Sequence, residues 1–277
     1  MLRALKSAVI GPVTGPIGAM LTPVLTPIIT PLLNTLYPPR CLACGDRTDG
    51  ARGLCGTCWR DTHFITGAAC GKCGVPLIGD STAPDAFISD AVDTCDPCLR
   101  RPPAWDAGAA AVLYGGAARR AVLGFKHGDR LDMRDALAEW MLPAGRALLA
   151  RADIVAPVPL HWRRLLRRRY NQSAELARAL ARRSDREMVP DLLTRRRFTT
   201  PQEKMDWTAR ARNQAGAFVV TPRHAARVDG RSILLIDDVL TSGATLSSGA
   251  EALRAAGASR VDVLVLARVA FAEGGSI

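Results

Sequence analysis

The stretch from Ile233 to Leu246 reads Ile-Leu-Leu-Ile-Asp-Asp-Val-Leu-Thr-Ser-Gly-Ala-Thr-Leu. Its run of branched apolar residues predicts a buried strand, and two acids, Asp237 and Asp238, come at the carboxyl end of that strand. A short loop of hydroxyl side chains and glycine follows, and then a helical pattern begins. In open parallel sheets, ligands bind beyond the carboxyl ends of the strands. The stretch therefore predicts both a fold class and the place of a site.

The loop after the strand has the chemistry of a phosphate site. Backbone amides at the start of a helix attract a dianion, hydroxyls add donors, and a glycine permits close approach. We expect a phosphate to bind the residues that follow the acids: Val239, Leu240, Thr241, Ser242, Gly243, Ala244 and Thr245. The two acids can accept hydrogen bonds from vicinal sugar hydroxyls, directly or with Mg²⁺ nearby. An acid pair at a strand end is also typical of a helix cap or a solvated turn.

Residues 104–277 alternate strand and helix patterns. We expect strands over residues 109–114, 153–158, 231–239 and 261–269. Helices are expected over residues 117–125, 133–149, 173–183 and 246–256, the third beginning at Ser173 and the last closed by Gly257. This alternation predicts an α/β domain, with a mainly parallel sheet and flanking helices.

Eight cysteines form four Cys-x-x-Cys pairs, and none lies beyond residue 98. Pairing in chain order predicts two tetrahedral Zn²⁺ sites, one of Cys41, Cys44, Cys55 and Cys58 and one of Cys70, Cys73, Cys95 and Cys98. Gly45 and Gly74 each follow a pair, where a tight turn favours positive φ. Disulfides, a redox pair and an iron–sulfur cluster are the alternatives, but four repeats of this spacing favour structural zinc. Residues 37–103 are therefore expected to form a small domain held together by metal.

The first 36 residues are apolar and rich in proline, and Arg3 and Lys6 are their only charges. A secretory signal, a membrane span and a surface-associated extension compete as interpretations. Repeated prolines oppose a membrane span, and the free-thiol pattern downstream favours a reducing, cytoplasmic location. We expect an extension, and membrane contact through it stays open.

The 233–246 unit resembles the binding signature for 5-phosphoribosyl-1-pyrophosphate (PRPP) of type I phosphoribosyltransferases, with Ser242 where threonine is common. Together with the cysteine pairs, it makes residues 36–270 resemble the ComF family of competence-related proteins. Arg169 stands where that family usually has glycine. Further segments carry the resemblance: residues 36–45, Tyr114, residues 125–128, residues 158–160, residues 168–172, Gln202, Arg210, Asn213 and residues 217–218.

The resemblance implies a type I phosphoribosyltransferase fold, a parallel sheet with flanking helices, preceded by a double zinc ribbon. It implies Mg-PRPP as ligand, with Asp237 and Asp238 as catalytic residues on the ribose and the following loop on the 5-phosphate. The pyrophosphate side would be formed by Lys126, Arg163, Arg164 and Arg168. The implied reaction is displacement of pyrophosphate from ribose C1. The family name implies DNA uptake, with other DNA-uptake proteins as partners. The alternative is a non-catalytic accessory protein that senses PRPP or a nucleotide and binds single-stranded DNA.

The net charge of +11 arises largely from residues 160–212, which hold 15 Arg or Lys and 6 Asp or Glu. Guanidinium groups suit a departing pyrophosphate. Arginines beside Tyr170, Phe198 and Trp207 would also suit single-stranded DNA, through charge and stacking. For the arginines at helical spacing within residues 173–183, we favour a solvated helix face. For those of residues 163–169, we favour a phosphate role.

Overall fold

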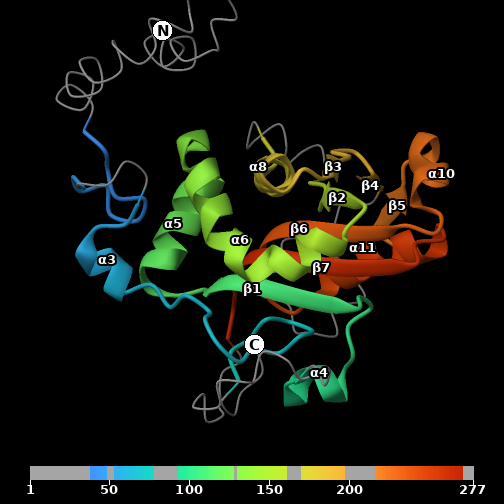
Figure 1. The fold of residues 1–277 in the computed structure, drawn as a ribbon, viewed down its shortest axis with the longest axis horizontal. Helices are drawn as coiled ribbons and strands as arrows, with labels where there is room; N and C mark the ends of the chain where they lie inside the picture. The colour runs from blue at the N-terminus through green and yellow to red at the C-terminus, as the bar shows by residue number, and fades with distance from the viewer. Residues whose placement is uncertain are drawn as a thin grey trace, which may run out of the picture.

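The computed structural model describes residues 38–48, 53–77, 93–127, 130–160, 170–196 and 216–270. Within these residues, five parallel strands form one sheet in the order β1-β7-β6-β2-β3 (Figure 1). The strands are β1 (Ala107–Leu113), β2 (Ile154–Pro157), β3 (Glu187–Met188), β6 (Ser232–Leu240) and β7 (Arg260–Arg268). The α/β prediction is confirmed, and β6, which carries the two acids, lies in the middle of the sheet.

Helices cover both faces of the sheet. On one face, α5 (Gly116–His127), α6 (Arg134–Arg151) and α8 (Gln172–Ser184) pack on Leu234 and Ile236 of β6. On the other face, α11 (Ala244–Ala255) packs on Ile233 and Leu235. Consecutive strand residues point to opposite faces, and all four of these side chains are fully buried. The unbroken Ile-Leu-Leu-Ile run is thus explained by a strand that is covered on both sides.

All four predicted helices are present with bounds shifted by one or two residues, and two of the shifted starts bear on the site. The expected helix 246–256 begins two residues earlier, as α11, and Gly257 follows it with φ of 94° as expected. The helix expected to begin at Ser173 is α8, and its N-cap is Asn171, whose side-chain oxygen accepts a hydrogen bond from the Ser173 amide at 3.1 Å. The Ser173 hydroxyl is therefore not used as the cap and is available for another contact.

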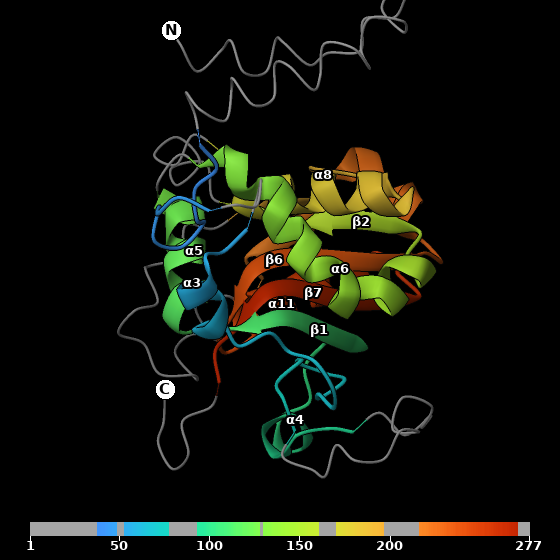
Figure 2. The same cartoon turned by 60° about the vertical axis from the view of Figure 1, so that its left-hand side comes forward.

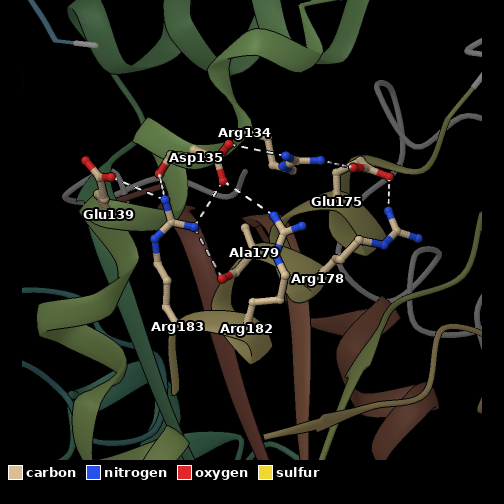
Figure 3. A network of polar contacts seen from close by, with 8 residues as sticks. All are labelled: Arg134, Asp135, Glu139, Glu175, Arg178, Ala179, Arg182 and Arg183. Carbon is tan, nitrogen blue, oxygen red and sulfur yellow. Dashed lines mark hydrogen bonds and ion pairs between the residues drawn. The ribbon is translucent and has the colours of Figure 1, made fainter. Parts of the chain in front are cut away.

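Helix α8 is fixed on α6 by ion pairs along its length (Figure 3). Arg134 of α6 reaches Glu175 at 3.1 Å, and Arg183 of α8 reaches Asp135 at 3.0 Å. Arg183 also lies 3.3 Å from Glu139. The α8 arginines Arg178, Arg182 and Arg183 are exposed, as expected, and Arg183 also joins the two helices by its ion pairs. Each such pair adds little stability alone, but the network orients the first turn of α8.

A smaller antiparallel pair joins β4 (Leu193–Arg195) to β5 (Phe218–Val220), and the Arg195 guanidinium lies 5.1 Å from the Phe218 ring centroid. The described residues also form the short helical turns η1 (Leu131–Met133), η2 (Pro222–His224) and α10 (Ala225–Val228).

The cysteine-bearing segments lie along the β1 side of the sheet. Helix α3 (Gly56–Arg60) lies beside α5, and α4 (Asp96–Arg100) lies beyond β1 (Figure 1 and Figure 2). The chain between them pairs with β1, since the Ile65 amide donates to the Ala111 carbonyl and the Leu113 amide donates to the His63 carbonyl, each at 2.9 Å. This linker covers what would otherwise be an open sheet edge.

In the part of the chain that the structure describes, none of the helices combines the length and the apolar character that a membrane crossing requires. The proline-rich residues 1–36 lie outside the described residues, and so do residues 161–169 and 197–212 of the basic stretch.

Candidate functional site

Strand β6 delivers Asp237 and Asp238 to the carboxyl edge of the sheet, as the sequence predicts. Both neighbouring strands, β2 and β7, run parallel to it. All three strands therefore end at the same edge, where a ligand can meet several loops.

Asp237 is half-buried and hydrogen-bonded to α8. Its Oδ1 accepts from the Ser173 hydroxyl at 2.8 Å and from the Asp238 amide at 2.9 Å. Burial and, secondly, the neighbouring Asp238 carboxylate raise the pKa of Asp237 to about 7, although the Ser173 hydroxyl and Lys126 oppose this shift. Near neutral pH, a carboxyl group with such a pKa is partly protonated. A ligand that binds only the carboxylate form therefore shifts Asp237 toward its ionised state.

Asp238 forms an ion pair with Lys126 at the end of α5. The Lys126 Nζ lies 3.1 Å from Asp238 Oδ2, and these side chains are 25% and 12% exposed. The start of α8 and the residues just before it fix the end of α5, because the Tyr170 hydroxyl donates to the Phe125 carbonyl and the side-chain amide of Gln172 donates to the Lys126 carbonyl at 3.2 Å. Residues far apart in sequence thus hold one lysine against the second acid.

The phosphate loop, residues 239–245, continues from the acids into the first turn of α11. Gly243 has φ of 80°, a left-handed conformation that favours glycine, and its carbonyl accepts from the Ser247 amide at 2.8 Å. The first amides of a helix have no acceptor within the helix, which suits an anion; here the Ala244 amide donates to the Ser242 hydroxyl oxygen at 3.5 Å. The loop, Asp237 and Leu246 line an open hollow of about 200 Å³. Asp238 is not part of this lining.

A buried arginine supports the phosphate loop from the neighbouring strand. Arg268, at the end of β7, is 2% exposed. Its Nη1 donates to the carbonyls of Leu240 at 3.0 Å, Thr241 at 2.8 Å and Val269 at 2.6 Å. Hydrogen bonds from a charged donor are stronger than neutral ones, so Arg268 fixes the start of the loop and places a positive charge beneath it.

The cysteines form two clusters with the geometry of metal sites. The first ribbon consists of Cys41, Cys44, Cys55 and Cys58, and the second ribbon of Cys70, Cys73, Cys95 and Cys98. In each, the sulfur atoms lie within 4.8 Å of one another, and the Sγ atoms of Cys44 and Cys55, and of Cys73 and Cys95, are 3.7 Å apart. A tetrahedral Zn²⁺ with Zn–S of about 2.3 Å requires neighbouring sulfurs about 3.8 Å apart. The donors therefore fit zinc, and none of the eight cysteines, all of which lie in described residues, forms a disulfide.

The turns that follow the first pair of each ribbon are alike. Gly45 has φ of 83° and Gly74 has φ of 70°, which confirms the prediction that both turns use positive φ.

Comparison with known proteins identifies the same two regions, the cysteine-bearing segment and the α/β domain. The double zinc ribbon domain family matches residues 32–99, and the phosphoribosyl transferase domain family matches residues 166–273. The DNA utilization protein YhgH of Escherichia coli (strain K12) is 31% identical over 224 residues, which cover 79% of this chain and 92% of that protein. The chain belongs to the ComF family. Another relative, competence protein F of Haemophilus influenzae, is 27% identical over 235 residues, which cover 83% of this chain and 96% of that protein.

A solved structure of the allosteric regulatory enzyme of purine biosynthesis aligns with 52% of this chain and 30% of its own length, with TM-score 0.35 and 19% identity. The family assignment does not rest on this distant alignment.

The sequence-predicted residues of the ComF-family site are thus placed as follows. The two acids and residues 239–245 form one contiguous edge, with Lys126 beside Asp238. Arg163, Arg164 and Arg168 lie outside the described residues. Sequence reasoning missed Ser173, Arg268 and Trp105, whose ring lies against the phosphate loop. Ser173 directly follows the quoted 168–172 motif, which was a usable signal for it.

Proposed function

We propose that the phosphate loop and the two acids before it bind Mg-PRPP, and that the domain transfers the phosphoribosyl group of PRPP to an acceptor. One observation carries this proposal: Asp237 and Asp238 end the central strand, and a loop with Gly243 in the left-handed region leads directly into α11. Amides, hydroxyls and the start of a helix suit the 5-phosphate. Paired carboxylates suit the ribose 2′- and 3′-hydroxyls.

The transfer would be a substitution at ribose C1. The nucleophile forms a bond to C1, the bond from C1 to the pyrophosphate oxygen breaks, and pyrophosphate leaves with the electron pair. Mg²⁺ bound with the ligand would neutralise charge on the phosphate oxygens. Asp237 and Asp238 would fix the ribose, and Lys126 would move from Asp238 to the leaving group, where a cation stabilises developing charge. Arg163, Arg164 and Arg168 are the other proposed pyrophosphate ligands.

Calorimetric titration with Mg-PRPP tests the site. Asp238→Asn should weaken binding at least about tenfold, because it removes a charged acceptor. Glu187→Gln is the matched control, since Glu187 pairs at the surface with Arg227 and lies beside Ile154 at the start of β2, away from the carboxyl edge of the sheet. The site assignment is wrong if Asp238→Asn binds Mg-PRPP as tightly as the parent chain. Pyrophosphate release, screened against bases and amines, tests turnover separately.

We further propose that each ribbon holds one structural Zn²⁺, since four thiolates leave no open position for water. Metal analysis of the purified chain should find two zinc ions per chain, and a metal-free folded chain would contradict this. The proposed division is residues 1–36 as an extension, residues 37–103 as the double ribbon and residues 104–277 as the phosphoribosyltransferase domain, in a cytoplasmic protein.

A second candidate function is a non-catalytic accessory role in DNA uptake, with single-stranded DNA and other DNA-uptake proteins as partners. The names of the relatives, DNA utilization protein and competence protein F, favour it, as does the excess of arginine in residues 160–212. Its test is salt-dependent binding of single-stranded DNA. Replacing the arginines of residues 163–169 should reduce both the affinity and the salt slope. Unchanged binding would count against this role.

A further inference from the structure

Trp105 connects the second ribbon to the start of the sheet. Its indole Nε1 donates to the Lys72 carbonyl at 2.6 Å, and Lys72 lies inside the turn between Cys70 and Cys73. The same turn makes two more contacts with this part of the chain: the Gly108 amide donates to the Gly71 carbonyl at 2.8 Å, and the Lys72 Nζ donates to the Asp106 carbonyl at 2.6 Å. Trp105 is buried, with 4% of its surface exposed. Because its indole N–H is hydrogen-bonded to the turn, the position of its ring depends on the position of the turn.

The far edge of the same ring lies against the phosphate loop. A methyl group at Gly243 would lie 2.9 Å from Cη2 of Trp105 and 3.6 Å from the Leu240 side chain. Leu240, within the loop, and Leu246, directly after it, belong to the same buried cluster as Trp105 and the second-ribbon cysteines. One indole ring thus touches the metal-binding turn through its N–H and the left-handed loop residue through its opposite edge.

We propose that Trp105 is a positioning residue that couples metal binding by the second ribbon to the conformation of the phosphate loop. The inference rests on the proposed function in taking this loop as the ligand site. With zinc bound, the Cys70–Cys73 turn holds the Lys72 carbonyl, the carbonyl fixes the indole, and the ring keeps Gly243 in its left-handed conformation. Without zinc, the turn loses its anchor and the loop gains alternative conformations.

This coupling must act in both directions, because linkage between two sites is reciprocal. A ligand that orders the phosphate loop must also stabilise the ring, the turn and the metal of the second ribbon. The first ribbon provides an internal reference, since its Cys41 and Cys58 belong to a different buried cluster with Ala117 of α5.

The test compares Trp105→Phe with the control Trp140→Phe in the full zinc-loaded chain. Phenylalanine keeps an aromatic ring but removes the indole N–H and is too short to span both contacts. Trp140, on α6, is half-buried, and its ring centroid lies 5.3 Å from that of Phe64. Hydrogen exchange of residues 241–246 reports on the loop. Alkylation of the cysteines in the presence of a chelator, mapped by mass spectrometry, reports on each ribbon separately.

In Trp105→Phe, we expect exchange of residues 241–246 and alkylation of Cys70 and Cys73 to speed up about fivefold or more, within the usual range of coupling between sites. Alkylation of Cys41 and Cys58 should not change, and Trp140→Phe should change neither readout. Mg-PRPP should slow alkylation of the second ribbon in the parent chain but not in Trp105→Phe. Should Trp105→Phe fail to fold, Gly243→Ala, which presses on the ring from the loop side, should still speed up alkylation of Cys70.

Equal loop exchange in Trp105→Phe and Trp140→Phe would overturn the inference, whether or not PRPP binds. If Trp105→Phe does not fold, unchanged Cys70 alkylation in Gly243→Ala would overturn it. If the parent chain does not bind Mg-PRPP but Trp105→Phe still loosens the loop, the proposed function fails and the coupling stands. If the parent binds Mg-PRPP without any change in alkylation of the second ribbon, the function stands and the coupling fails.

Discussion

The two ribbons share one ligand pattern but have different surroundings. In the first ribbon, Cys44 is exposed and Cys55 is partly exposed, whereas all four cysteines of the second ribbon are buried. The first ribbon packs on Ala117 near the start of α5, and the Arg120 guanidinium lies 3.7 Å from Cys58 Sγ and 2.9 Å from Asp61. The second ribbon packs on β1 and Trp105.

Their links to the site differ in kind. The first ribbon supports α5, whose far end presents Lys126 to Asp238 by charge. The second ribbon reaches Gly243 by direct packing through Trp105. Identical ligand spacing therefore does not imply equal roles, because the residues around a metal site determine what the metal stabilises.

Loss of a single ligand should have the largest effect and should separate the two ribbons. Cys70→Ser removes a ligand that is 1% exposed and also accepts a hydrogen bond from the Cys95 amide at 3.3 Å. We expect a loss of unfolding free energy of about 4 kcal/mol or more, because metal binding contributes directly to folding. For the exposed Cys44, Cys44→Ser should cost about 2 kcal/mol. Denaturant unfolding together with zinc content checks this, and equal losses would contradict the comparison.

Substitution of the equivalent glycines should have the next largest effect. A methyl group at Gly74 would lie 2.5 Å from the Ala110 amide nitrogen and 2.9 Å from the Ala109 carbonyl carbon, whereas no atom lies within 4 Å of one at Gly45. Gly45→Ala should cost about 1 kcal/mol, for left-handed strain alone. Gly74→Ala should cost about 3 kcal/mol, because the strand backbone cannot move aside easily. Urea unfolding curves measure both, and a larger loss for Gly45→Ala would reverse the assigned roles.

The buried Asp237, beside the charge link from α5, should give a smaller, pH-dependent effect on stability. Asp237 has a pKa of about 7, above the ordinary value of 3.8. Its protonated form therefore adds stability at low pH, and this contribution is lost as pH rises through about 7. We expect the unfolding free energy to fall between pH 5 and pH 8 on the order of 2 kcal/mol, and Asp237→Asn to flatten this slope.

Variants at the two links should affect this pH profile differently. Lys126→Met should move the fall to higher pH, since Lys126 lowers the pKa of Asp237, whereas Trp105→Phe should leave the pH of the fall unchanged. Stability curves at several pH values measure this, and a pH shift in Trp105→Phe as large as in Lys126→Met would contradict the distinction between a charge link and a packing link.

The sequence predicts the central strand, its acids and the four cysteine pairs because each is a local pattern with a local physical cause. The supports of the loop have no such local cause. Arg268 looks like a basic residue that ends an apolar strand, and only the pairing of Leu240 with Arg268 across β6 and β7 brings its guanidinium to the loop carbonyls. Trp105 meets Gly243 only after β1 and β6 have taken their places in the sheet.

The α8 cap shows a local ambiguity of another kind. Asn171 and Ser173 are both good capping residues. Asn171 takes the cap, and the Ser173 hydroxyl donates to Asp237 instead. That choice depends on β6 and could not be made from the helix sequence alone.

The most direct test of the account is a structure of the chain with Mg-PRPP. The account predicts the 5-phosphate within hydrogen-bond distance of the amides of residues 242–245, the ribose hydroxyls on Asp237 and Asp238, and Lys126 displaced from Asp238. Ligand bound elsewhere, with the 3.1 Å ion pair between Lys126 and Asp238 intact, would contradict it.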